Sequence, residues 1–322
     1  MNLASTLKHA AETAASAARS HAPEREGERA EESAAPERIA VIADSCTDVP
    51  VDFAAEHGVH VIPLHINYEH ESYLDRVDIQ PEEVYARMPG EIPTTSTPTP
   101  AEVSAAFDAV AAEGFTHVVA VTISSGLSAT CDLVRSIAAG RADLTTEVVD
   151  TKNIGFGAGF SVILAAQLVE AGLSFSEVCA RVEAAAKRAQ VFFCVDTLDY
   201  LRAGGRIGAA AYAIGSRLDV RPIITCNEEG VYVPVAKAHG RKASLKKTLQ
   251  LVEKRALELR EQGAQELRLA VVHAAAEDEA RGLEAKLREM FPGVDILFGQ
   301  LSPALVVHTG PKMIGLGVQA VA

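Results

Sequence analysis

The chain has 322 residues, of which 48% are apolar and 23% are charged, a composition typical of globular proteins that excludes a wholly disordered chain. Because domains commonly have about 100–200 residues, we expect one large domain or two medium ones. The net charge of −13 disfavours a protein that binds nucleic acid by neutralising phosphates.

The first 37 residues differ from the rest of the chain. Alanine is abundant in them, and the stretch from Glu24 to Glu37 is almost entirely Glu, Arg, Ala and Pro. Such a segment cannot bury enough apolar surface to offset its chain entropy. We therefore predict that residues 1–37 form a disordered extension. A helix that binds a partner is the alternative, because Ala, Glu and Arg favour helix.

Residues 38–172 alternate between short apolar runs and segments with helical spacing. This alternation is typical of parallel strands joined by crossover helices, so it predicts an α/β domain with a parallel sheet. The expected strands are Ile39–Ala43, Val59–Ile66, His117–Thr122 and Glu147–Asp150. The expected helices are Pro81–Met88, Pro100–Glu113, Leu127–Ala139 and Gly155–Ala171.

Residues 173–322 mix hairpins with helices, which predicts an α+β domain with a mixed or antiparallel sheet. The expected helices are Ser174–Gln190, Leu198–Arg202, Ala243–Gln262 and Glu277–Met290. The expected strands are Val191–Val195, Arg221–Cys226, Val231–Ala238, Leu267–Val272, Val294–Phe298 and Leu305–His308. The turn Asn227–Gly230 separates two of these strands and is a hairpin signal.

Five cysteines and no CxxC motif in a chain of this size make structural disulfides improbable and favour a reducing compartment. No apolar run reaches the roughly 18 residues of a membrane span, and no secretory signal is visible. We therefore expect a cytoplasmic protein without stable membrane insertion.

Hydroxyl side chains gather in two loops that precede helices. One loop runs from Thr94 to Thr99 and the other from Ser124 to Thr130. Free N–H groups at a helix N-terminus attract anions, and Ser and Thr add hydrogen-bond donors without charge, so the pattern suits a carboxylate or a phosphate. The alternative is helix capping alone, for which Ser and Thr are preferred residues. Two such loops in one α/β domain favour the anion site.

Motifs for cofactors and metals are weak. Gly155, Gly157 and Gly159 open a helix after a strand but lack the third glycine of a dinucleotide fingerprint at its usual offset, so close helix packing is the preferred interpretation. The sequence has no GxxxxGK[ST] loop and no HExxH motif, and the spacings among its histidines match no ordinary zinc pattern. We therefore expect no cofactor and no metal site.

Several residues are compatible with other functions. Ser45, Ser124 or Ser125 could be a nucleophile, although no GxSxG elbow is present, and His273 and His308 are candidate bases at the ends of expected strands. Arg206 and Arg241 each follow glycine in an acidic chain, and they could recognise a phosphate or an acidic partner. The alternative is that these arginines are solvated loop residues.

Together these segments resemble the DegV family, whose better-studied members are bacterial fatty-acid-binding proteins of the FakB type. The matching stretches occur in family order over residues 38–322. They are Ile39–Pro50, Thr95–Pro98, Ile123–Thr130, Val149–Thr151, Val195–Ile207, Arg221–Ile224, Gly240–Lys242 and His308–Pro311. One such stretch would be a weak signal, but the ordered series is a specific one.

The resemblance implies two domains with one long-chain fatty acid in a tunnel between them. Its carboxylate would be bound by the hydroxyl loops and a C-terminal histidine, which here are Thr95, Ser96, Ser124, Ser125 and His308. The family's proteins are not kinases themselves. They present the acid to a separate ATP-dependent fatty acid kinase, which makes an acyl-phosphate for phospholipid synthesis.

Within that scheme, we assign Arg206 and Arg241 to kinase docking. The main alternative to a carrier is a serine-dependent hydrolase or acyltransferase that acts on lipids through Ser124 or Ser125 with His308. A regulatory protein for which the lipid is a sensor ligand is the third reading.

Overall fold

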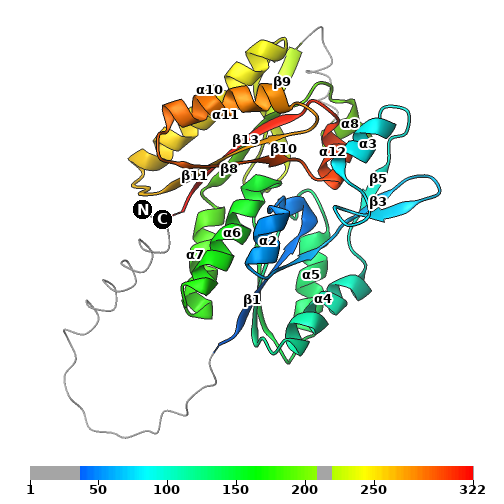
Figure 1. Ribbon diagram of the computed structural model, residues 1–322, viewed down its shortest axis with the longest axis vertical. Coiled ribbons are helices and arrows are strands. Elements are labelled where there is room, and N and C mark those ends of the chain that lie inside the picture. The colour runs from blue at the N-terminus through cyan, green and yellow to red at the C-terminus, as the bar shows by residue number, and fades with distance from the viewer. Residues whose placement is uncertain (1–36, 209–219, 322) are drawn as a thin grey trace, which may run out of the picture.

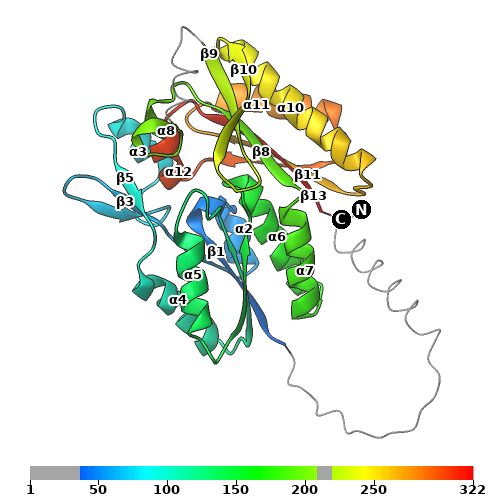
Figure 2. The same ribbon diagram turned by 180° about the vertical axis from the view of Figure 1, so that it is seen from behind.

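The computed structural model describes residues 37–208 and 220–321, and its strands form three sheets (Figures 1 and 2). A four-stranded sheet has the order β2-β1-β6-β7, a six-stranded sheet has the order β10-β9-β8-β13-β11-β12, and a three-stranded sheet has the order β4-β3-β5. The predicted disordered extension lies outside the described residues apart from Glu37.

The four-stranded sheet is parallel throughout, which confirms the α/β prediction for the N-terminal part. Its strands are β1 (Ile39–Asp44), β2 (Val59–Ile62), β6 (His117–Thr122) and β7 (Thr145–Asp150). One face packs against α4 (Pro100–Ala112) and α5 (Thr130–Ala139). The 3-10 turn Ser45–Thr47 and α2 (Val51–Glu56) follow β1. Because all four strands are parallel, the loops that follow their carboxyl ends lie along one edge of the sheet.

The other face of this sheet packs against α6 (Phe156–Glu170) and α7 (Phe175–Ala186). Helix α6 is buried nearly all round because it lies between the two large sheets (Figure 1). A Cβ atom on Gly159 would lie 2.4 Å from the carbonyl oxygen of Thr47, and one on Gly157 would lie 2.6 Å from Val191. These glycines therefore serve close helix packing, as predicted.

The six-stranded sheet is mixed, which confirms the predicted class of the C-terminal part. Strands β11 and β12 are parallel, and the other neighbouring pairs are antiparallel. The strands are β8 (Ala189–Cys194), β9 (Val220–Cys226), β10 (Tyr232–His239), β11 (Leu267–His273), β12 (Asp295–Gln300) and β13 (Ile314–Ala320). Helices α10 (Arg241–Glu261) and α11 (Glu277–Met290) cover its outer face (Figure 1).

A small sheet lies beside the two large ones. It contains β3 (His65–Asn67), β4 (Ser72–Leu74) and β5 (Thr94–Ser96). The helices near it are α3 (Pro81–Arg87), α8 (Asp199–Ala203) and α12 (Pro303–Thr309) (Figure 1). The single strand predicted over 59–66 was wrong, because the chain leaves the parallel sheet at Pro63, which has no N–H to donate to a ladder.

The C-terminal segment holds a second correction. The strand predicted over Leu305–His308 was wrong, because these residues lie in α12. Ser302 at the N-cap, Pro303 at the first position and Gly310 after the end set the bounds of a helix, and they outweigh the β-branched run inside it. His308 therefore lies in the last turn of a short, wholly buried helix.

The predicted domain boundary at 172/173 stays a prediction. Helix α7 follows it in sequence but packs in the same apolar cluster as β1 and α6. Among the described helices, none combines the length and the apolar character needed to cross a bilayer.

Candidate functional site

A cavity of about 500 Å³ lies where the carboxyl-end loops of the parallel sheet meet α12 and β10. Four of the five predicted ligand residues line it, namely Thr95, Ser96, Ser125 and His308. The other polar residues that line it are Thr97, Ser128, Asp132 and Arg206. The remaining residues are Cys46, Leu64, Ile123, Leu127, Ala129, Ile154, Tyr232, Ala304 and Leu305. The structure thus brings together hydroxyls, an imidazole and a guanidinium at one mouth.

Ser124, the fifth predicted residue, does not line the cavity. It is fully buried, and its hydroxyl donates to the carbonyl oxygen of Gly230 at 2.8 Å. A Cβ atom on Gly230, whose φ is +78°, would lie 1.9 Å from that hydroxyl. Ser124 therefore attaches the β9–β10 turn to the first domain.

His308 is the centre of the polar mouth. Its Nε2 lies 2.7 Å from the hydroxyl oxygen of Thr95 on β5, and its Nδ1 is buried without a hydrogen-bond partner. Burial, together with the positive charge of Arg206, lowers the pKa of His308 to about 4. The imidazole is therefore neutral at pH 7, so it can give or accept a hydrogen bond but carries no charge.

Ser125 is held by a charged pair behind it. The ammonium Nζ of Lys152 donates to the Ser125 hydroxyl oxygen at 2.8 Å and pairs with Asp150 at 2.8 Å. The backbone N–H of Ser125 also donates to Asp150, at 3.2 Å. Both partners belong to the end of β7 and the loop after it, so the sheet edge itself positions this hydroxyl.

An apolar pocket of about 30 Å³ adjoins the polar cavity. The two share Ile154, Tyr232 and Leu305. Its other lining residues come from α6, the six-stranded sheet and the ends of α12: Gly155, Phe156, Val191, Phe193, Val272, Leu301, Thr309, Met313, Gly315, Leu316 and Gly317. A polar mouth followed by an apolar interior suits a ligand with one charged end and a hydrocarbon body.

A buried acidic cluster holds α12 in place. Asp48 accepts hydrogen bonds from the backbone N–H of Ser302 and from Arg76, both at 3.0 Å. Asp75 accepts from the N–H of Ala304 at 3.1 Å and from the hydroxyl of Ser45 at 2.6 Å. Burial raises the pKa of Asp48 to about 6. In the sequence, Asp48 stands out only as part of the family-like stretch Ile39–Pro50, and nothing marks Asp75, whose role depends on a contact more than two hundred residues away in the chain.

The two arginines assigned to docking have different surroundings. Arg206 lines the polar cavity and donates to the carbonyl oxygen of Gly204. Arg241, at the start of α10, makes a two-pronged ion pair with Glu279 on α11, and its side chain is 19% exposed. Arg206 is thus part of the cavity, and Arg241 is engaged within the C-terminal domain.

Comparison with known proteins identifies the family of this chain. A model of an uncharacterised family, DegV, matches residues 38–321. The chain belongs to the DegV family. A DegV domain-containing protein of Clostridium perfringens is 35% identical to it over 286 residues, which cover 88% of this chain and 99% of that protein. One from Clostridium acetobutylicum is 34% identical over 284 residues, covering 87% and 98%.

Solved DegV structures share the whole architecture. The structure of DegV from Bacillus subtilis, described as a fatty acid binding protein, has a TM-score of 0.80 at 26% identity and covers 88% of this chain and 99% of its own. A DegV family protein from Thermus thermophilus, described by its fatty acid binding, matches with the same TM-score and coverage at 30% identity. A stearic acid-binding protein from Eubacterium ventriosum matches at 26% identity and a TM-score of 0.80, covering 88% and 98%.

In this DegV-family chain, neither Ser124 nor Ser125 has a hydrogen bond to His308, the pairing that a hydrolase built on these residues needs. Ser124 bonds to Gly230 and Ser125 to Lys152, whereas the contact of His308 is with Thr95. The second nitrogen of His308 lacks the partner that would orient a catalytic imidazole. His273 ends β11, as predicted, and does not line the cavity.

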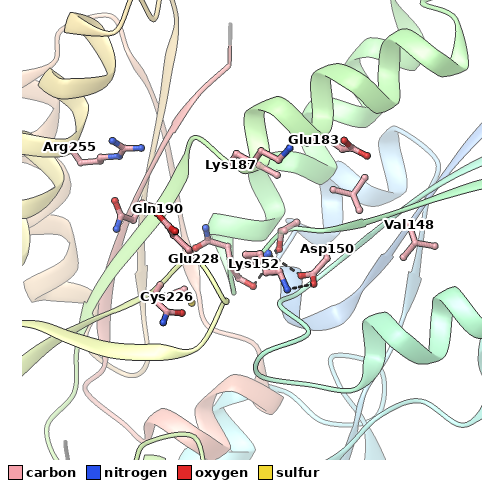
Figure 3. Close-up of a pocket in the computed structure, with 14 residues that line it drawn as sticks. Val148, Asp150, Lys152, Glu183, Lys187, Gln190, Cys226, Glu228 and Arg255 are labelled. Atoms are coloured by element: carbon pink, nitrogen blue, oxygen red, sulfur yellow. Dashed lines mark hydrogen bonds and ion pairs between the residues drawn. The ribbon is translucent and has the colours of Figure 1, made fainter.

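A second, charged cavity of about 770 Å³ lies between the end of β7, the end of α7 and the β9–β10 turn of this DegV-family fold (Figure 3). Lys152 and Asp150 face it from the end of β7, Glu183 and Lys187 from α7, and Arg255 from α10. Lys152 thus borders this cavity while its ammonium group bonds to Ser125 of the first one. Within residues 37–208 and 220–321, no group of His, Cys, Asp and Glu side chains is arranged to hold a metal ion.

Proposed function

We propose that this protein binds one long-chain fatty acid, with the carboxylate in the polar cavity and the acyl chain in the apolar pocket. The observation that carries the proposal is that the polar cavity and the apolar pocket adjoin, with Ile154, Tyr232 and Leu305 forming part of the wall of both. Each buried methylene contributes roughly 0.8 kcal/mol, so the hydrocarbon supplies most of the affinity. Solved relatives described as fatty-acid-binding and stearic-acid-binding proteins support the same ligand class.

The polar mouth then selects the headgroup. Thr95, Ser96, Ser125 and His308 offer hydrogen bonds, and Arg206 supplies a positive charge that neutral His308 does not. Because the guanidinium fork suits oxyanions, Arg206 joins the predicted carboxylate residues in this proposal. Ser124 acts behind them by holding the β9–β10 turn.

The carrier delivers its ligand to a separate ATP-dependent fatty acid kinase, and the product feeds phospholipid synthesis. In that step a carboxylate oxygen attacks the γ-phosphorus of ATP held by the kinase, and ADP leaves as the acyl-phosphate forms. The sequence has no Walker-type ATP loop, which is consistent with ATP on a partner. The carrier itself holds the carboxylate and shields the chain.

The ligand assignment has a direct test. We expect protein purified without added lipid to contain about one fatty acid per chain, because the apolar pocket binds a hydrocarbon tightly. Native mass spectrometry measures the occupancy, and extraction after denaturation identifies the acid. Repeated extraction without any acyl chain, together with no uptake of added fatty acid, would contradict the proposal.

Kinase docking at Arg241 is tested by two matched variants. Arg241→Ala is expected to leave fatty-acid binding and the melting temperature unchanged but to lower phosphorylation by the partner kinase, because the guanidinium, though 19% exposed and paired with Glu279, carries a positive charge that attracts an acidic face. Glu279→Gln removes the ion-pair partner and keeps Arg241, so phosphorylation should persist in it. If both variants lose stability and turnover equally, the ion pair is structural and the docking assignment is wrong.

A further inference from the structure

We propose that Lys152 is a positioning residue for the headgroup. Its ammonium group keeps the Ser125 hydroxyl available to the ligand and cancels the charge of Asp150, so that the site prefers a carboxylate to an uncharged headgroup. The inference rests on the proposed function and names a residue that selects the ligand's chemistry.

The contacts around Ser125 carry the first step. An ammonium group has donors only, so in its bond to Lys152 at 2.8 Å the Ser125 oxygen must accept. A hydroxyl that accepts from behind still has its own proton to donate. Ser125 lines the polar cavity, where a carboxylate oxygen would be the acceptor.

The charge of Asp150 explains why a cation is needed beside the headgroup site. Its side chain is 13% exposed and receives the backbone N–H groups of Ser125 and Lys152 at 3.2 and 3.1 Å. Burial would raise the pKa of Asp150, but the hydrogen bonds from Lys152 and Ser125 outweigh burial and hold that pKa below its usual value. This carboxylate is therefore ionised beside the headgroup site. Without Lys152 it would repel a fatty-acid carboxylate, and the Ser125 hydroxyl, whose side-chain hydrogen bond already contributes to the low pKa of Asp150, would turn fully to it.

The backbone at Lys152 is a second, independent observation. Its φ is +51°, in the left-handed region that is costly for a residue with a side chain. A Cβ atom on Gly230 would lie 3.1 Å from the Lys152 side chain, so the turn of the neighbouring hairpin packs against it. Figure 3 shows Lys152 and Asp150 joined at the centre of the charged cavity. The strained turn thus directs the ammonium group back to Ser125.

The same contacts argue against Lys152 as a base for a nucleophilic Ser125. A base must accept a proton, whereas the ammonium group paired with Asp150 at 2.8 Å has donors only. Lys152 therefore acts through Ser125 and Asp150 and does not itself react.

The test compares oleate with oleyl alcohol, which share one hydrocarbon chain and differ in charge. Lys152→Met is expected to raise the dissociation constant of oleate about tenfold or more, because the hydrogen bond from Ser125 to the charged carboxylate is lost. The dissociation constant of oleyl alcohol should change much less. Lys152→Arg should restore most of the preference. Lys187→Met, in the same charged cavity but away from Ser125, is the matched control and should bind oleate as the parent does.

A double variant separates positioning from structure. Asp150→Asn combined with Lys152→Met removes the competing charge, so oleate binding should recover in part, whereas a structural role predicts further loss. Equal losses of acid and alcohol in Lys152→Met, or no loss of either, would overturn the role of Lys152. A parent protein that binds neither ligand overturns the proposed function and this inference with it.

Discussion

Gly204→Ala is expected to weaken fatty-acid binding about ten- to hundredfold. A Cβ atom there would lie 2.1 Å from Nδ1 of His308, so the imidazole must move and its contact with Thr95 at 2.7 Å is lost. The φ of Gly204 is −74°, which alanine adopts freely, so the effect comes from the collision alone. Losing the hydrogen bond from His308 to a charged headgroup costs about 1.5–3 kcal/mol, and about 1.4 kcal/mol is a factor of ten in affinity. Isothermal titration with a fatty acid measures the change.

Two further variants make the Gly204 result specific. Gly208→Ala is the control, because a Cβ atom there meets nothing within 4 Å, and it should bind as the parent does. In a His308→Ala background the collision partner is gone, so Gly204→Ala should add little. The same loss in both backgrounds would contradict the assigned role of His308.

Arg76→Met is expected to destabilise the fold by about 3–5 kcal/mol at pH 8, since it leaves Asp48 as a buried charge without its partner. The Arg76 guanidinium lies 3.0 Å from Asp48 and from the carbonyl oxygen of Gln300. Arg135→Met is the matched control, because its ion pair with Asp132 is exposed on α5 and contributes about 0–1 kcal/mol. Chemical denaturation at several pH values measures both variants.

The pH dependence of the Arg76 effect has a definite sign. The pKa of Asp48 is about 6 in the folded protein, above its usual value, so the folded state binds more protons between the two values and its stability decreases as pH rises through 6. Without Arg76 that pKa rises further, and the gap to the parent should widen with pH and narrow towards pH 4. A constant gap across this range would show that the guanidinium acts by packing and not by charge.

Local patterns predicted both large sheets because their strands are apolar runs bounded by polar loops. The parallel sheet and the helix Glu277–Met290 follow the prediction, the latter to the residue. Helix α12 was not predicted, since it is buried on every side and shows no periodicity. Strand β13 was missed because Gly315 and Gly317 weaken its strand signal. The side chains of Val272 and Phe160 pack closely against these glycines, and such tertiary contacts cannot be predicted from the local sequence.

The candidate site shows the same division. The hydroxyl loops were found from sequence because their Ser and Thr residues precede helices, and four of the five predicted residues line one cavity. Neighbours across the chain were not predictable. Lys152 reaches Ser125 from the end of another strand, and Arg206 joins the cavity from the C-terminal part. The first contact depends on which strands are neighbours in the parallel sheet and the second on how the two large sheets meet, and no local pattern encodes either.

The small apolar pocket has a consequence for the speed of ligand exchange. Its volume of about 30 Å³ is about that of one water molecule in the liquid, far less than an acyl chain occupies. Side chains such as Met313 and Leu305 must therefore move aside before a chain can enter or leave. The residence time of the lipid is then set by how often the protein opens, not by how well water solvates the lipid. Warming or mild denaturant should accelerate release more than detergent does.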